Sequence, residues 1–183
     1  MKKCAIIGGS IAGSLCAILL KQLGFDVSIF EKTSQQNIPD RGAGIWLPPQ
    51  VIETLTQYGI LPTDFPRLMI QHRPIYFYEH VKQHNKLITQ HPIDAAAVYW
   101  LTLYQALEKA RPDHVHYDSE IINITQQEES VTVITKKYEK HHFDFCICAD
   151  GIGSIGRQLL FPEAKPHFTQ TTVWRGTLAK TSP

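Results

Sequence analysis

In the first 32 residues the hydrophobic pattern changes from that of a strand to that of a helix and back to that of a strand. Residues 3–8, "KCAIIG", form an apolar run that predicts a short buried strand. Residues 10–23 carry apolar residues at helical spacing, and Gly24 stands where such a helix would end. The predicted apolar stripe consists of Ile11, Leu15, Ile18 and Leu19. Residues 26–31, "DVSIFE", predict a second strand, so this segment indicates two parallel strands joined by a helix.

The rest of the chain continues with strands and helices. Helices are expected at residues 50–60, closed by Gly59, and at 98–110. Residues 74–79 and 86–90 predict two strands joined by the polar stretch 80–85. Residues 114–149 predict three consecutive strands, and the buried run 143–149 leads into Asp150-Gly151 and a helix starting near Ser154. Together these elements predict an α/β fold.

The basic start "MKK" followed by an apolar stretch raises the alternative of a signal peptide or membrane anchor. The stretch contains Gly8, Gly9, Ser10 and Gly13, which suit a turn, and no A-x-A-like cleavage site follows Leu20. Lys21 also interrupts the run before the length that a membrane span needs. The pattern therefore favours a folded unit and no stable membrane insertion.

Composition narrows the function classes. The chain has 183 residues, 43% hydrophobic and 19% charged, which is typical of a globular protein. Its net charge of +1 gives no electrostatic case for binding nucleic acid or an anionic membrane. The four cysteines lie in apolar stretches, so we expect buried thiols and a cytoplasmic location. No C-x-x-C or H-E-x-x-H spacing is present, and we expect no metal site.

The turn "GGSIAG" between the first strand and helix is similar to the dinucleotide fingerprint G-x-G-x-x-G. Gly8 and Gly13 match the first and third glycines, and Ser10 replaces the second with another small residue. Glu31 ends the second strand, where an acid would accept hydrogen bonds from a ribose and disfavour a 2′-phosphate. A helix N-terminus here would bind a diphosphate, so FAD or NAD is favoured over NADP. Three neighbours complete the cofactor-binding set predicted at this turn: Ile11, Ala12 and Lys32.

The stretch "DFCICADGIGSIGRQLLFP", residues 144–162, resembles the GADGxxSxxR motif of FAD-dependent aromatic hydroxylases of the para-hydroxybenzoate hydroxylase type. The positions that match are Ala149, Asp150, Gly151, Ser154 and Arg157. The resemblance implies that Asp150 and Gly151 bind the ribityl or pyrophosphate side of FAD. It also implies a glutathione-reductase-like, Rossmann-like parallel sheet with an antiparallel meander and part of a substrate-domain sheet.

Other segments are similar to the same family in the same order. "RGAGIWLPPQ", starting at Arg41, is similar to the segment that passes beside the flavin, so Arg41 and Gly44 are expected near FAD. The helix predicted at 98–110 and the segment "TTVWRGTLA" also have counterparts. The resemblance implies one FAD-binding domain over residues 1–183, with substrate-domain fragments at about 70–95 and 171–183.

The chain departs from the family pattern at three residues and in length. Besides Ser10, Cys148 replaces the first glycine of GADG, and Trp100 stands where an arginine that contacts FAD is common. Similar variants occur in the branch that acts on hydroxylated pyridines. Family members continue well beyond residue 183, so the chain resembles an N-terminal portion of a larger protein.

The resemblance implies a flavoprotein monooxygenase that uses NADH or NADPH and O₂ to hydroxylate a small aromatic or heteroaromatic substrate. Whether this chain is itself an enzyme stays open, and no catalytic residue is identified. The alternatives are a non-catalytic FAD- or nucleotide-binding remnant and another FAD oxidoreductase, a reductase or epoxidase. The oligomeric state also stays open, with a homodimer as one expectation.

Overall fold

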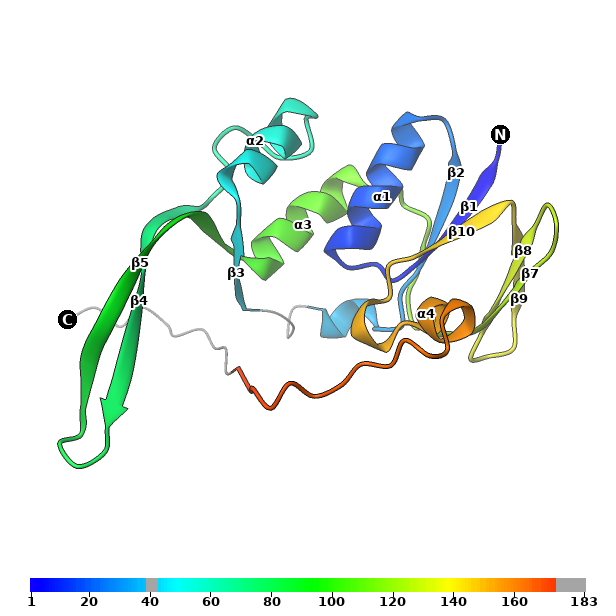
Figure 1. The fold of residues 1–183 in the computed structure, drawn as a ribbon. Helices are drawn as coiled ribbons and strands as arrows, with labels where there is room; N and C mark the ends of the chain where they lie inside the picture. Colours follow the sequence, from blue (N-terminus) through cyan, green and yellow to red (C-terminus); the bar gives the residue numbers. More distant parts are fainter. Residues whose placement is uncertain (39–42, 174–183) are drawn as a thin grey trace. The chain divides into compact units, whose positions relative to one another are not determined.

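The computed structural model describes residues 1–38 and 43–173 (Figure 1). The chain divides into two units, which we treat separately. The first unit contains residues 1–41 and 104–174, and the second contains residues 42–103 and 175–183. The prediction for Arg41 lies outside the described residues.

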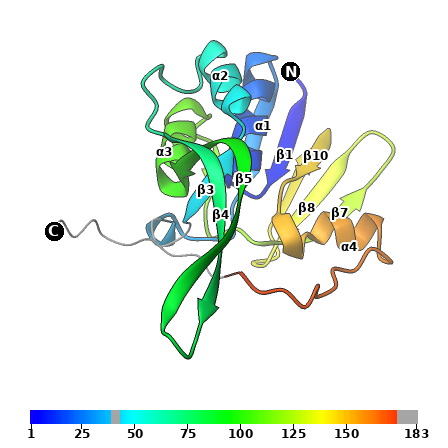
Figure 2. The same cartoon turned by 60° about the vertical axis from the view of Figure 1, so that its left-hand side comes forward.

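The first unit is built on a parallel four-stranded sheet in the order β10-β1-β2-β6. Its strands are β1 (Lys3–Ile7), β2 (Asp26–Phe30), β6 (Val115–His116) and β10 (Phe145–Cys148). Helix α1 (Ile11–Gln22) joins β1 to β2, as predicted from the sequence (Figure 2). The fold class is therefore confirmed: a mixed α/β fold with a parallel sheet.

Alternation along β1 separates the core of the first unit into two layers, because successive strand residues point to opposite faces. Cys4 and Ile6 pack with Ala17 of α1 on one face. Ala5 and Ile7 pack on the other face with Phe30 and with residues of an antiparallel meander. The parallel sheet is thus covered on both faces, which explains why β1 is apolar at nearly every position.

The meander has the strand order β7-β8-β9: β7 (Ile121–Gln126), β8 (Val131–Thr135) and β9 (Lys140–Phe143). Residues 114–149 therefore hold five strands rather than the three predicted. The short β6 joins the parallel sheet, and only Asp144 separates β9 from β10. After β10 come a 3₁₀ turn (Gly151–Gly153) and α4 (Ile155–Leu160). Ser154 is the N-cap of this helix, which starts near the predicted position, and its Oγ accepts a hydrogen bond from the Arg157 amide.

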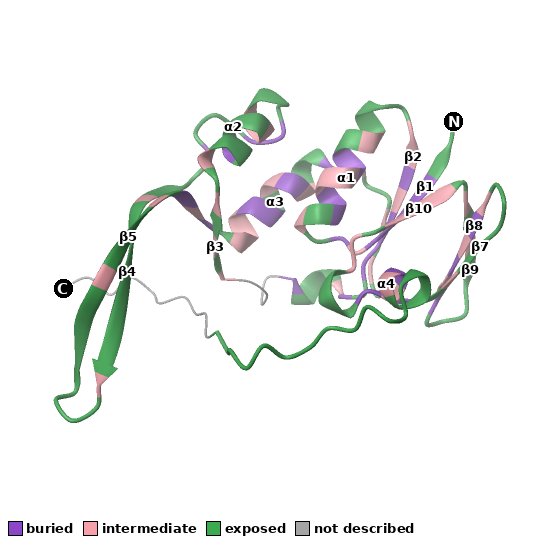
Figure 3. Cartoon of the chain, viewed as in Figure 1, coloured by how far each residue is buried: buried purple, intermediate pink, exposed green. Residues whose placement is uncertain are grey.

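The second unit contains an antiparallel sheet in the order β3-β5-β4. Its strands are β3 (Gly44–Leu47), β4 (Leu68–Glu79) and β5 (His84–Tyr99), and α2 (Pro49–Gln57) follows β3. The β4–β5 hairpin is longer than the two strands predicted and is mostly exposed beyond its base (Figure 3). Helix α3 (Trp100–Ala110) begins in this unit and continues into the first.

Several local expectations need correction. The buried residues of α1 are Gly13, Ser14, Ala17 and Ile18, whereas Leu19 is exposed, because the close helix–sheet contact uses small side chains. Of the four cysteines, all free, only Cys4 is fully buried and Cys148 is exposed. Residues 3–22 form a central strand and its covering helix, which argues against a signal peptide within them. None of the helices within residues 1–38 and 43–173 has the length and apolarity to cross a bilayer.

Candidate functional site

Two turns meet at one end of the parallel sheet. The first follows β1 at Gly8 and the second follows β10 at Asp150, and β1 and β10 are adjacent and parallel. A Cβ atom added to Gly8 would lie 2.4 Å from the carbonyl oxygen of Ala149, so only glycine allows this approach. Gly8 also has φ of +99°, a conformation that side chains disfavour.

The third glycine of the fingerprint has a separate role. A Cβ atom added to Gly13 would lie 1.8 Å from the Gly8 carbonyl oxygen, so α1 approaches the turn more closely than any side chain permits. The first amides of α1 are therefore held directly beside the turn. They have no partner within the helix, and no acidic residue lies in its first turn. This arrangement suits an anion such as a diphosphate.

A cavity of about 200 Å³ lies at the meeting of these turns. Most of the cofactor-binding residues predicted from sequence line it: Gly8, Ser10, Glu31, Lys32, Asp150 and Gly151. Ile11, Ala12 and Gly13 form the first turn of α1 directly after Ser10. Gly44 lies on β3 in the second unit and is not among the lining residues.

The carboxylate of Glu31 is buried and has backbone partners. Its Oε2 accepts from the Gly9 amide and its Oε1 from the Thr33 amide, both at 2.8 Å. The sequence predicts a ribose contact at Glu31, and what the structure shows is that this carboxylate holds the glycine turn. Each carboxylate oxygen can accept more than one hydrogen bond, so a ribose hydroxyl remains compatible with these contacts.

Only one of the two carboxylate oxygens of Asp150 has a hydrogen-bond partner. Its Oδ2 accepts from the Ile155 amide at 2.7 Å, whereas its Oδ1 is buried without a hydrogen-bond partner. Buried polar atoms usually have partners, so an unpaired oxygen in a cavity wall suggests a ligand that donates to it. A hydroxyl-rich chain such as the ribityl group of FAD provides such donors.

The substitution of Cys148 for a family glycine is accommodated by α4. A Cβ atom on Gly156 would lie 2.2 Å from the Cys148 Sγ, so the absence of a side chain at Gly156 provides the space. The hydrogen bond that the Cys148 thiol donates to Cys146, followed by burial, raises the pKa of Cys148, which therefore stays a thiol near neutral pH. Within the described residues, no group of three or more His, Cys, Asp or Glu residues could hold a metal ion.

Sequence reasoning missed several residues around the cavity. Ser119 and Glu120, which precede β7, line it, and so does Phe30 at the end of β2. Arg111, at the end of α3, contacts the glycine turn from outside the cavity. Nothing in the local sequence "EKARPDHV" marks this arginine, because its partner Gly9 lies 102 residues earlier.

A profile of the family described as "FAD binding domain" matches residues 1–181. This chain belongs to the FAD-binding domain family. The match, with the relatives below, confirms the resemblance to FAD-dependent hydroxylases that the Asp150 motif indicated, and it supports FAD as the cofactor.

The chain is also similar to individual flavoprotein monooxygenases. It is 25% identical over 175 residues to 2,6-dihydroxypyridine 3-monooxygenase of Paenarthrobacter nicotinovorans, a match that covers 95% of this chain and 42% of the relative. It is 29% identical to 6-hydroxynicotinate 3-monooxygenase of Pseudomonas fluorescens, with 87% of this chain and 43% of the relative covered. The chain therefore spans less than half the length of these relatives.

A solved structure supports the fold. The 2,6-dihydroxypyridine-3-hydroxylase from Arthrobacter nicotinovorans matches with a TM-score of 0.74 at 23% identity, covering 92% of this chain and 41% of that chain. At this identity the likeness establishes the fold alone.

Proposed function

We propose that this chain binds FAD in the cavity between the Gly8 and Asp150 turns, as the FAD-binding part of a monooxygenase. The observation that carries the proposal is the convergence of the two turns on a cavity with an unpaired Asp150 oxygen in its wall. In this arrangement the first amides of α1 bind the diphosphate, and Glu31 accepts from the adenosine ribose. Asp150 and Gly151 bind the ribityl side.

The proposed reaction is hydroxylation of an aromatic or heteroaromatic ring with O₂ and NADH or NADPH. Bound flavin supplies the redox chemistry, and the protein holds the cofactor and excludes water. The names of the relatives support a small hydroxylated ring as substrate, since two of them act on pyridine-type compounds. The flavin contacts that the resemblance implies for Arg41 and Gly44 stay predictions.

A direct test is the titration of the purified chain with FAD, followed by flavin fluorescence and absorbance. We expect saturable binding that Glu31→Ala weakens by about tenfold, because the variant loses the ribose acceptor and the anchor of the Gly9 amide. Glu128→Ala, an exposed carboxylate in the β7–β8 turn, is the matched control and should bind like the wild type. Wild-type FAD affinity in Glu31→Ala would count against this assignment.

Catalysis is tested separately by NADH and NADPH oxidation with FAD and a pyridine such as 2,6-dihydroxypyridine or 6-hydroxynicotinate. Oxidation stimulated by the ring, with a hydroxylated product, supports the monooxygenase. FAD binding without such oxidation favours the non-catalytic alternative for this chain. The similarity to zeaxanthin epoxidase, at 24% identity, makes epoxidation of an alkene the second reaction to assay.

We further propose a cytoplasmic location, which the four free cysteines support because a reducing compartment preserves thiols. The homodimer expected from the sequence is tested by size-exclusion chromatography with light scattering. A monomer at all concentrations would reject the homodimer without affecting the FAD proposal.

A further inference from the structure

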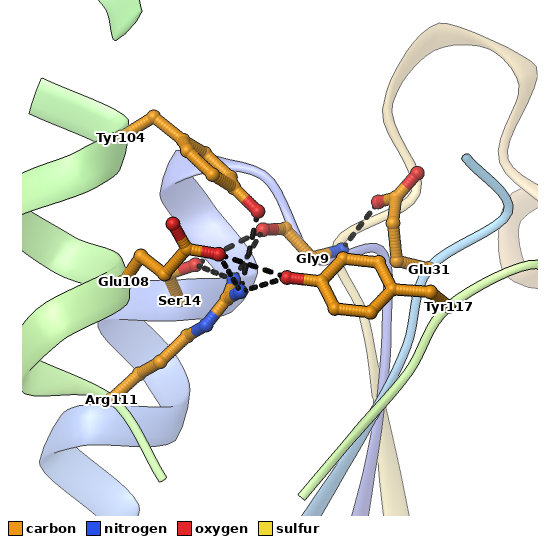
Figure 4. A network of polar contacts seen from close by, with 7 residues as sticks. All are labelled: Gly9, Ser14, Glu31, Tyr104, Glu108, Arg111 and Tyr117. Carbon is orange, nitrogen blue, oxygen red and sulfur yellow. Dashed lines mark hydrogen bonds and ion pairs between the residues drawn. The ribbon is translucent and has the colours of Figure 1, made fainter. Parts of the chain in front are cut away.

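The Gly9 residue of the turn is held from two sides (Figure 4). Its N–H donates to Glu31 Oε2 at 2.8 Å. Its carbonyl oxygen accepts from the Ser14 hydroxyl at 3.0 Å and from Arg111 Nη1 at 3.2 Å. Glu31 and Arg111 lie on opposite sides of Gly9 in Figure 4. Gly9 is therefore fixed in position and orientation by three side chains.

The orientation of the Gly9 carbonyl determines the orientation of the next amide. The Gly9–Ser10 peptide bond is trans, since the described residues contain no cis peptide, so its C=O and N–H point in opposite directions. Because the carbonyl points to Arg111, the Ser10 N–H points away from Arg111. Donors on the carbonyl also polarise the peptide and strengthen its N–H as a donor.

Arg111 is itself held rigidly. It is buried, and its Nη2 donates to Tyr104 Oη at 3.2 Å and to Glu108 Oε1 at 3.1 Å. It also donates to the Tyr117 hydroxyl, which in turn donates to Glu108 Oε1 at 3.0 Å. The guanidinium carbon lies 5.3 Å from the Tyr104 ring centre and 5.9 Å from that of Tyr117. These contacts supply the hydrogen bonds and the counter-charge that a buried guanidinium needs.

Arg111 is not among the residues that line the cavity. It therefore does not contact a dinucleotide bound there, and it acts on the turn through the residues that it holds. Arg111 Nη1 also donates to the Ser14 hydroxyl at 3.1 Å. Lysine could not replace Arg111, because a single ammonium cannot donate to Gly9 and Ser14 while also serving Tyr104, Glu108 and Tyr117.

We propose that Arg111 is a positioning residue for the dinucleotide: with Ser14, it fixes the Gly9–Ser10 peptide so that the Ser10 amide faces the diphosphate. The effect on FAD rests on the proposed function. The effect on the turn does not, because it is measured by hydrogen exchange without added FAD. If Arg111 only stabilised the first unit as a whole, replacing it would affect residues 8–14 no more than the rest of that unit.

The test uses the full chain with Arg111→Met, Arg111→Lys and Ser14→Ala. FAD dissociation constants are measured by flavin fluorescence, and amide hydrogen exchange is measured on the flavin-free proteins. We expect the dissociation constant to rise roughly tenfold in both Arg111 variants and about threefold in Ser14→Ala, which loses one donor to Gly9. Exchange should accelerate in residues 8–14 and remain unchanged in β1.

Arg67→Met is the matched control, because Arg67 also donates to a backbone carbonyl, that of Phe65, but lies in the second unit. It should bind FAD like the wild type. Unchanged FAD affinity in folded Arg111 variants, or exchange that accelerates equally in β1 and residues 8–14, would overturn the proposal. If Arg111→Met does not fold, wild-type affinity in both Arg111→Lys and Ser14→Ala overturns it equally. If the wild type binds no FAD, the proposed function fails, and the exchange data still decide whether Arg111 holds the turn.

Discussion

The sheet core of the first unit and the outer β4–β5 hairpin of the second bury their aromatic residues very differently. In the first unit, Phe30 is 2% exposed and packs between the parallel sheet and the meander. In the second unit, Phe77 on the β4–β5 hairpin is 58% exposed, and Tyr76 and Tyr78 beside it are also exposed. The first unit is covered on both faces of its sheet, whereas the outer hairpin exposes large apolar side chains among the described residues. The stability of the described chain should therefore reside mainly in the first unit.

The sharpest test of this contrast makes the same change in both units. We expect Phe30→Ala to lower the free energy of unfolding by about 3–5 kcal/mol, because it leaves a cavity between two layers. Phe77→Ala should change it by less than about 0.5 kcal/mol, because the ring has few contacts to lose. Urea denaturation followed by far-UV circular dichroism measures both. Equal losses in the two variants would refute the comparison.

A second pair of variants compares glycines. Gly13→Ala forces α1 away from the Gly8 carbonyl and should cost roughly 3 kcal/mol, in the upper range for overpacking. Gly44→Ala on β3 meets no atom within 4 Å and should leave stability within about 0.5 kcal/mol. The measurement is again chemical denaturation of the flavin-free chain. A stable Gly13→Ala variant would mean that the helix and turn are less tightly packed than the structure shows.

The smallest expected effect is a pH dependence of the stability, which arises from a histidine of the first unit. His116 stacks on Phe30 at 4.8 Å, and partial burial, followed by the nearby His141 and His114, lowers the pKa of His116. The unfolded chain therefore binds more protons than the folded chain below about pH 6.5, so stability rises with pH through that window. We expect the melting temperature to fall slightly from pH 7 to pH 5, and less so in His116→Phe. An identical pH profile in His116→Phe would exclude this origin.

Much of the site was accessible from local sequence. Gly8, Gly13 and Glu31 were predicted from spacing alone, because a turn, a close helix approach and a strand end each require a particular residue type. Asp150 and Gly151 were predicted from a family motif. What could not be predicted was that Glu31 anchors the Gly9 amide, that Asp150 keeps one oxygen unpaired, and that Gly156 makes room for Cys148. These facts depend on atoms that residue types alone do not place.

The sequence by itself determined the β1-α1-β2 unit, the start of α4 and the family, since these depend on hydrophobic periods and on contiguous motifs. Only the tertiary structure decided the strand order β10-β1-β2-β6, by which the two turns that the sequence assigned to one FAD come together. It also decided that Arg111 contacts Gly9. The physical reason is that hydrophobic periodicity in the sequence shows which face of an element is apolar. Which distant residue contacts a buried charge depends instead on how the elements pack.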